Sequence, residues 1–237
     1  MGYNQIPGVD FTENYSPVIH DSTFRIILIL YILEDLDAEI FDVETAFLYG
    51  NLQEDIYMHP PEGFLIHKEI YGVKPPEEQA STKSMCIKKN GKYCLKLMKA
   101  LYGLVQAARQ WFKEFIAYLV NVLHFTSSES DPCLLFKRKN DKVVFMCIYV
   151  DDVLCVGHKE MIKQAIQDIK DKYKIKEIGN IQDYVGCKIK EGNKNIFYSP
   201  TRPYRKNGTQ LQKGNTKFKN RVFYTSKHWR YGNPRSK

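Results

Sequence analysis

Apolar positions along the chain switch between helical spacing and short strand-like runs. After a candidate N-cap at Asp21 or Ser22, apolar residues recur at roughly helical intervals as far as Leu36, which predicts a first helix. Similar spacing predicts helices over 106–123 and 159–173. Apolar runs between turn residues predict strands over 39–42, 85–87, 93–95, 133–137, 143–149, 153–157, 184–189 and 196–198. The mixture predicts an α/β fold of the α+β type.

Composition places the chain among globular proteins that can bury a core. Of its 237 residues, 43% are hydrophobic and 13% are aromatic, which suits one domain or two small subdomains. The longest apolar stretch, Phe24–Leu33, contains Arg25 and is far shorter than the ~20 residues that cross a bilayer. The first residues carry no secretion signal. We therefore expect an intracellular protein, in a cytoplasmic particle or the nucleus, without a membrane partner.

The six cysteines give no sign of a disulfide framework or a metal site. They occur without any C-x-x-C pair, and several lie inside apolar runs. We therefore expect reduced, packed thiols, with neither disulfides nor a zinc knuckle.

The net charge of +8 comes from the end of the chain. Residues 202–237 hold 11 Lys and Arg and no Asp or Glu, whereas residues 1–201 have a net charge of −3. A polar segment of one charge sign, without apolar periodicity, buries too little surface to offset the entropy of ordering. We therefore expect an ordered domain over 1–200 and a basic, disordered tail over 201–237. A nucleic-acid-binding arm is the alternative for the tail.

Two adjacent carboxylates, Asp151 and Asp152, lie in the predicted turn between two apolar strands. Asp42 ends another predicted strand, so the three carboxylates meet if the strands are neighbours. Clustered like charges are costly without a cation, although most Asp-Asp pairs lie in surface hairpins. Carboxylate oxygens suit Mg²⁺, and two such ions support phosphoryl transfer. The order strand, acidic turn, strand, helix fits a ferredoxin-like split βαβ sheet.

Five segments carry a resemblance and occur in one order along the chain. They are Gly8–Val18, Asp42–Gly50, Ile56–Phe64, Lys99–Arg109 and Tyr149–Asp152. Through these segments the chain is similar to the Ty1/copia-type retrotransposon reverse transcriptases, which are parts of a Pol polyprotein. The resemblance covers roughly residues 4–200, nearly all of the chain before the tail.

The resemblance implies a right-hand polymerase palm with partial fingers over residues 1–200. It implies an RNA-directed DNA polymerase that transfers nucleotides to a primer 3′-hydroxyl by two-metal chemistry. Asp42 and Asp151 would be the catalytic ligands of two Mg²⁺ ions, with Mn²⁺ as a substitute, and Asp152 would complete the cluster. The implied partners are an RNA or DNA template with its primer and deoxynucleoside triphosphates.

The resemblance also assigns residues around the substrates. Phe47 falls at the aromatic gate position, where its ring would crowd the 2′-carbon of the incoming sugar and favour deoxynucleotides. The alternative for Phe47 is plain core packing, and the alternative for Tyr102 is an aromatic residue at a helix start. The remaining assigned residues are Tyr102, Gly103 and Gln106 beside the nascent base pair, Tyr149 in the acidic turn, and Tyr184 and Gly186 in the hairpin that supports the primer.

The chain departs from the family pattern in three ways. Ala108 stands where the family usually has proline, which removes a rigid helix-start position but no catalytic atom. The family's basic strand would precede Gly2 and its thumb would follow Pro200, so we expect both to be absent. We also expect the ribonuclease H and integrase modules to be absent. Accordingly, we expect little or no primer extension by the isolated chain.

Two other functions remain open at this stage. The first is a catalytically inactive retrotransposon remnant with at most nucleic-acid binding, which the missing basic strand and thumb favour. The second is a nucleotide cyclase with a two-carboxylate palm. A cyclase predicts a Gly-Gly-acid turn and gives no reason for the segment Tyr102–Gln106, so it ranks lowest.

Overall fold

The computed structural model describes residues 2–60, 86–89 and 92–179, and after them the strand residues 183–184, 187–192, 195–200 and 222–225. The chain divides into two compact units. Unit 1 consists of Met1–Ser16 and Thr45–Tyr118, and unit 2 consists of Pro17–Glu44 and Leu119–Lys237. Each unit is therefore built from two separate stretches of the chain.

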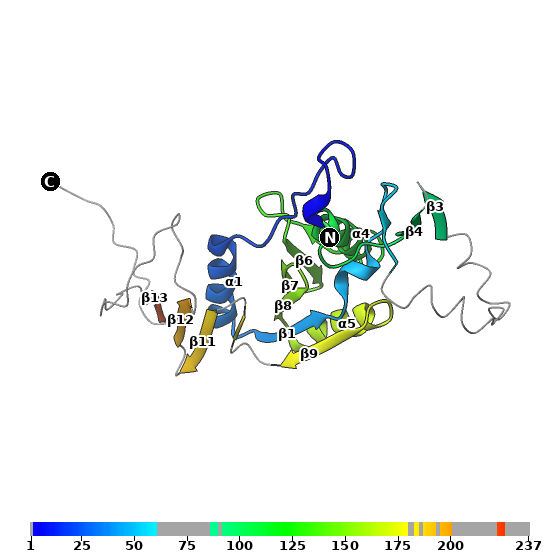
Figure 1. Cartoon of the computed structure of the whole chain (residues 1–237). Coiled ribbons are helices and arrows are strands. Elements are labelled where there is room, and N and C mark those ends of the chain that lie inside the picture. The colour runs from blue at the N-terminus through cyan, green and yellow to red at the C-terminus, as the bar shows by residue number, and fades with distance from the viewer. Residues whose placement is uncertain are drawn as a thin grey trace, which may run out of the picture. The chain divides into compact units, whose positions relative to one another are not determined.

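A six-stranded sheet organises unit 2 (Figure 1). Its strand order is β5-β6-β7-β8-β1-β9, and every neighbouring pair is antiparallel. The strands are β1 (Asp37–Val43), β5 (Thr126–Ser127), β6 (Leu134–Lys139), β7 (Lys142–Tyr149), β8 (Asp152–Gly157) and β9 (Ile175–Gly179). The N-terminal strand β1 thus lies between two strands from much later in the chain.

The helix α5 (Lys159–Lys170) connects β8 to β9. Both strands run antiparallel to β1, so they are parallel to each other with β1 inserted between them. This is the split βαβ order that the sequence predicts. The apolar face of α5 contacts β1, β7 and β8. The buried residues of that face are Ile162, Ala165, Ile166 and Ile169.

The strand β8 is apolar from Val153 to Gly157, and these residues are all buried. The β7–β8 pairing is close at its far end, where a Cβ on Gly157 would lie 2.3 Å from the carbonyl oxygen of Val143. The helix α1 (Asp21–Leu33) precedes β1 and buries Phe24, Ile27 and Leu28. The predicted helix extends to Leu36, but α1 ends earlier because the chain turns at Asp35, whose φ is 51°.

A second, four-stranded sheet belongs to the end of unit 2. Its order is β10-β11-β12-β13, with β10 (Asp183–Tyr184), β11 (Cys187–Gly192), β12 (Asn195–Pro200) and β13 (Val222–Thr225). β11 and β12 form the predicted hairpin. β13 comes from the basic tail and pairs with β12. The rest of residues 201–237 lies outside the described residues, so the disordered tail stays a prediction.

Unit 1 packs short elements around the helix α4 (Ala107–Asn121), whose last residues extend past the unit boundary at Tyr118. Trp111 is buried at the centre, and its ring stacks on Phe115 with centroids 4.8 Å apart. The other elements are η1 (Gly2–Asn4), η2 (Ala46–Tyr49), β2 (Tyr57–Met58), β3 (Cys86–Lys89) and β4 (Lys92–Lys96). The strands form a sheet in the order β2-β4-β3, in which β3 and β4 pair and overlap the predicted strands over 85–87 and 93–95.

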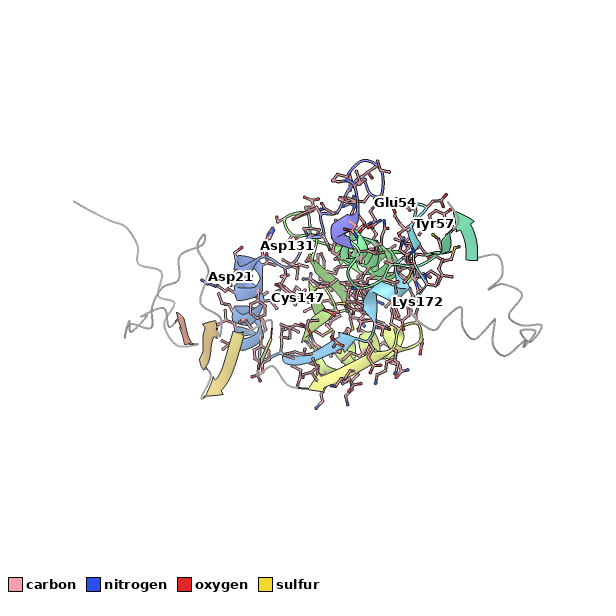
Figure 2. All side chains as sticks on the ribbon, in the orientation of Figure 1. Asp21, Glu54, Tyr57, Asp131, Cys147 and Lys172 are labelled. Carbon is pink, nitrogen blue, oxygen red and sulfur yellow. The ribbon has the colours of Figure 1, made fainter. Side chains whose placement is uncertain are left out.

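The buried cysteines agree with the sequence analysis. Cys133, Cys147 (labelled in Figure 2) and Cys155 are buried thiols outside any disulfide. Burial raises the pKa of the Cys133 thiol to about 12, and it also raises the pKa of Cys147 and Cys155. These groups therefore stay protonated and unreactive at neutral pH.

As for membranes, no helix within the described part of the chain is long and apolar enough to span a bilayer.

Candidate active site

The hairpin between β7 and β8 closes in a two-residue turn. Tyr149 lies opposite Asp152, so Val150 and Asp151 form the turn itself. Such turns match the twist of the strands but require a positive φ at the first central residue. Val150 has φ 59°, a region that costs a β-branched residue on the order of 1–3 kcal/mol. The two paired strands therefore hold a strained turn that carries Asp151 at its tip.

Asp42 on β1 lies directly opposite Asp152 on β8. Beside this pair, the backbone N–H of Val43 donates a hydrogen bond of 3.0 Å to the carbonyl oxygen of Asp151. The two strands are thus neighbours, which is the condition that the sequence sets for the three carboxylates to meet. All three aspartates are half-buried. Segments that are distant in the sequence therefore place three carboxylates at one end of the β8–β1 pair.

Burial and mutual repulsion both act on these carboxylates. Burial is the largest cause that raises the pKa of Asp42; the charge of Asp151 raises it further, Lys176 lowers it and Glu44 raises it. Burial likewise raises the pKa of Asp152, followed by the charges of Asp151 and Asp42. The carboxylates are thus within electrostatic reach of one another, and one lysine offsets only part of their charge. Such a cluster favours a bound cation.

Lys176 lies on β9, opposite Asp42 on the other side of β1. Close by, Lys174 Nζ forms an ion pair of 2.6 Å with Glu44 Oε2. Lys176 is not among the site residues predicted from the sequence, because β9 is not predicted either. Four of the five residues in β9 are exposed, so the strand lacks the apolar alternation of a half-buried strand. The β-branched residues Ile175 and Ile178, which flank Lys176 and Glu177, are the one local signal.

The raised pKa of Asp152 predicts a pH-dependent cost to stability. Because the folded-state pKa lies above the unfolded value near 3.8, ionising Asp152 opposes folding. The protonated carboxyl of Asp152 favours folding; this contribution to stability is fully present below the unfolded pKa and is lost as pH rises through the folded pKa. We expect Asp152→Asn to raise the free energy of unfolding at pH 8 by about 0.5–1 kcal/mol.

Urea unfolding at several pH values measures this effect. The gain from Asp152→Asn should shrink as pH falls from 8 toward 3.8, because the wild-type carboxyl becomes protonated on the way. Asp141→Asn, in the exposed turn between β6 and β7, is the matched control and should change stability little at either pH. A gain that grows as pH falls would contradict the assignment of a raised pKa.

The donor set of this cluster suits a divalent metal ion. Three carboxylates supply hard oxygen ligands of the kind that Mg²⁺ binds together with water and substrate phosphates. In the part of the chain that the structure describes, no three His, Cys, Asp or Glu side chains are already arranged to hold an ion. The backbones of the aspartates do lie side by side, and their carboxylates would have to converge further to share an ion.

Unit 1 brings two of the assigned aromatic residues together. The ring of Phe47, in η2, has its centroid 4.3 Å from that of Tyr102. Tyr102 is 57% exposed and Phe47 is half-buried, so the pair is not part of the deep core. An exposed aromatic pair offers a face against which a sugar or base can pack.

Gly103 and Gln106 follow Tyr102 along the chain but differ in exposure. Gly103 is exposed and has φ 99°, a conformation that favours glycine. Gln106 is fully buried, and its side-chain amide bonds to Gln5 and to the carbonyl of Asp10. Gln106 therefore links its own segment to the N-terminal residues Gln5 and Asp10 inside unit 1. Its contact with a template stays a prediction.

The remaining assigned residues lie in unit 2. Tyr149 ends β7, is half-buried and is paired with Asp152. Tyr184 belongs to β10 and pairs with Cys187 at the start of β11. Gly186 lies outside the described residues. Support of a primer by Tyr184 and Gly186 therefore stays a prediction.

Comparison with known proteins identifies the class. The family described as reverse transcriptase (RNA-dependent DNA polymerase) matches the chain over residues 1–74 and 65–200. The chain belongs to this family. Its mixed α/β structure with a mainly antiparallel sheet is consistent with a fragment of a reverse transcriptase.

Curated relatives confirm the resemblance to Ty1/copia-type transposons. The retrovirus-related Pol polyprotein from transposon TNT 1-94 of Nicotiana tabacum is 38% identical over 190 residues, or 79% of this chain. The corresponding polyproteins from transposons RE1 and RE2 of Arabidopsis thaliana are 32% and 31% identical over 80% and 85% of the chain. The chain spans only 12–13% of the length of these three relatives. No solved structure matches the chain.

Proposed function

We propose that this chain carries the palm and part of the fingers of an RNA-directed DNA polymerase, which adds deoxynucleotides to a primer 3′-hydroxyl. The observation that carries the proposal is the pairing of Asp42 with Asp152 beside the turn residue Asp151. Unit 2, with its split βαβ sheet, corresponds to the palm in this proposal. Unit 1, which contains Phe47 and Tyr102, corresponds to part of the fingers.

In this proposal Asp42 and Asp151 hold two Mg²⁺ ions, which Mn²⁺ can replace, and Asp152 completes the cluster. The ions, when bound, lower the barrier by activating the primer hydroxyl and neutralising the charge on the triphosphate. The chain's own contribution is to hold the carboxylates on two paired strands before substrate arrives. Such positioning matters because phosphoryl transfer depends mainly on alignment and charge stabilisation.

The proposed nucleotide-binding residues are Tyr149 in unit 2 and Phe47, Tyr102 and Gly103 in unit 1. Phe47, with Tyr102 against it, limits the space at the 2′-carbon of the sugar and so favours deoxynucleotides. Tyr149 and the turn at Gly103 contribute contacts to the substrate, and the hairpin that contains Tyr184 supports the primer. The partners that follow are an RNA or DNA template with its primer and deoxynucleoside triphosphates. The family membership and the Pol polyprotein relatives support these partners.

An inactive remnant that only binds nucleic acid is the second candidate function. The two candidates differ in one measurable property, which is chemistry that depends on Asp151.

A single-nucleotide addition assay distinguishes them. The chain, in excess over a DNA-primed RNA template, is mixed with one complementary deoxynucleotide and Mg²⁺ or Mn²⁺. We expect slow addition of one nucleotide, faster with the deoxynucleotide than with the ribonucleotide, and none by Asp151→Asn. Excess enzyme makes even slow turnover visible. Addition that persists in Asp151→Asn would reject the proposed site, and no addition with either metal would reject the polymerase proposal in favour of the inactive remnant.

A further inference from the structure

Tyr102 is presented on a tight turn of unit 1. The N–H of Leu104 donates a hydrogen bond of 3.1 Å to the carbonyl of Leu101, so Tyr102 and Gly103 are the central residues. A positive φ at the second central residue, here 99° at Gly103, is typical of a type II turn. The turn aims the ring of Tyr102 at Phe47. The position of this aromatic pair therefore depends on what holds the turn in place.

The side chain of Gln5 joins this turn to the N-terminal segment. Its Oε1 accepts a hydrogen bond of 2.9 Å from the backbone N–H of Val105, and its Nε2 donates one of 2.9 Å to Gln106 Oε1. Gln106 Nε2 in turn donates to the carbonyl of Asp10 at 3.1 Å. Because both polar atoms of Gln5 are used, this single amide fixes the chain just after the turn from two directions.

Gly2 fixes the turn itself. Its N–H donates a hydrogen bond of 2.9 Å to the carbonyl oxygen of Gly103. A Cβ at position 2 would lie 1.9 Å from that same oxygen, so only glycine allows the approach. The N-terminal segment thus contacts the turn at Gly103, Val105 and Gln106. We call these contacts the N-terminal brace.

We propose that Gln5 is a positioning residue for the nucleotide site, which acts by holding Tyr102 against Phe47 through the N-terminal brace. This inference rests on the proposed function, in which the aromatic pair packs against the incoming sugar. The side-chain hydrogen bonds of Gln5 go to Val105 and Gln106, so its effect on the rings passes through the backbone of the turn. Loss of its two hydrogen bonds lets the turn move and loosens the nucleotide site without removing any metal ligand.

Gln5→Met is the sharpest variant, because methionine keeps the length of the side chain and removes both hydrogen-bonding atoms. Gln5 also lines a cavity of about 340 Å³ together with Tyr57 (labelled in Figure 2), so water can reach the polar groups that lose their partner. We therefore expect the variant to fold. Gln5→Glu keeps the acceptor for the Val105 N–H and should have an intermediate effect.

Arg109→Ala is the matched control. The guanidinium of Arg109 bonds to the carbonyl of Tyr15 at 3.0 Å and pairs with Glu13, so it also ties the N-terminal stretch to α4. It does so away from the turn that carries Tyr102. A general loosening of the N-terminal stretch should therefore appear in both variants, whereas an effect on the nucleotide site should appear only in Gln5→Met.

The structural part of the test needs no turnover. In the full chain, Gln5→Met should speed hydrogen exchange of the Val105 amide by about 10-fold or more and weaken the Phe47–Tyr102 ring contact in nuclear Overhauser spectra. Arg109→Ala should change neither. Unchanged exchange at Val105, or an unchanged ring contact, in Gln5→Met would overturn the inference.

The kinetic part uses the single-nucleotide addition assay. Gln5→Met should raise KM for the deoxynucleotide about 5- to 10-fold, with kcat changed by less than about two-fold, and reduce discrimination against the ribonucleotide. Equal KM values for Gln5→Met and Arg109→Ala would overturn positioning by the brace. If the wild-type chain adds no more nucleotide than Asp151→Asn, the proposed function fails, and the exchange and ring-contact data alone decide whether the brace holds the turn.

Discussion

Asp42→Asn is expected to reduce nucleotide addition by about 10³-fold or more. Asparagine has nearly the same shape as aspartate, but it removes one negative charge from the cluster that would hold the metal ions. Asp42 lies opposite Asp152 and beside the turn that carries Asp151. No other carboxylate of β1 occupies this position, so none can take over its role. The measurement is the addition rate under single-turnover conditions at saturating nucleotide.

Two controls separate lost chemistry from a damaged fold. Asp141→Asn, in the turn between β6 and β7, changes the net charge of unit 2 equally and should leave the rate within about two-fold. Asp42→Asn should also be at least as stable as the wild type, since the pKa of Asp42 is raised by burial and by Asp151. A rate for Asp42→Asn close to that of Asp141→Asn would remove Asp42 from the proposed site.

The largest expected effect on stability is that of Phe41→Ala. Phe41 is fully buried on β1, where it pairs with Val153 on β8 and Glu177 on β9. Truncating a buried phenylalanine removes apolar contacts and leaves a cavity, which together cost about 3–5 kcal/mol. The midpoint of thermal unfolding should fall by roughly 6–20 °C, as followed by circular dichroism.

The matched control is Ile178→Ala on the neighbouring strand β9. Ile178 is 52% exposed, so its truncation should cost less than about 1 kcal/mol. Because Phe41 precedes Asp42, Phe41→Ala should also lower nucleotide addition as the register of β1 loosens. Similar losses of stability in the two variants would show that β1 is not the centre of the sheet in solution.

The sequence predicts the elements whose apolar pattern is local. The hairpin of β7 and β8, the hairpin of β11 and β12, and the helices α4 and α5 all have a continuous or periodic apolar pattern. The three carboxylates are also found from sequence, because each ends or follows an apolar run. Their meeting depends on a pairing of distant strands, which the sequence analysis could state only as a condition.

The missed features lack a local signal. The strand β9 is mostly exposed, so its sequence resembles a polar loop, and Lys176 is missed with it. β13 lies in a basic tail without periodicity. The N-terminal brace cannot be predicted from the sequence for another reason, since the hydrogen bond between Gln5 and Gln106 joins residues 101 positions apart. Side-chain amides in such pairs look like ordinary surface residues until the fold is known.

The central place of β1 has a consequence for synthesis on the ribosome. β1 emerges early, but both of its partners, β8 and β9, are translated more than 100 residues later. At about 5–20 residues per second, the strand waits roughly 6–23 s for the end of β8 with both edges unpaired. During that time Ile40, Phe41 and Val43, which the finished sheet buries, are open to chaperones or to other nascent chains. The acidic cluster can therefore form only after translation has passed Gly157, the end of β8, which makes it a late product of folding.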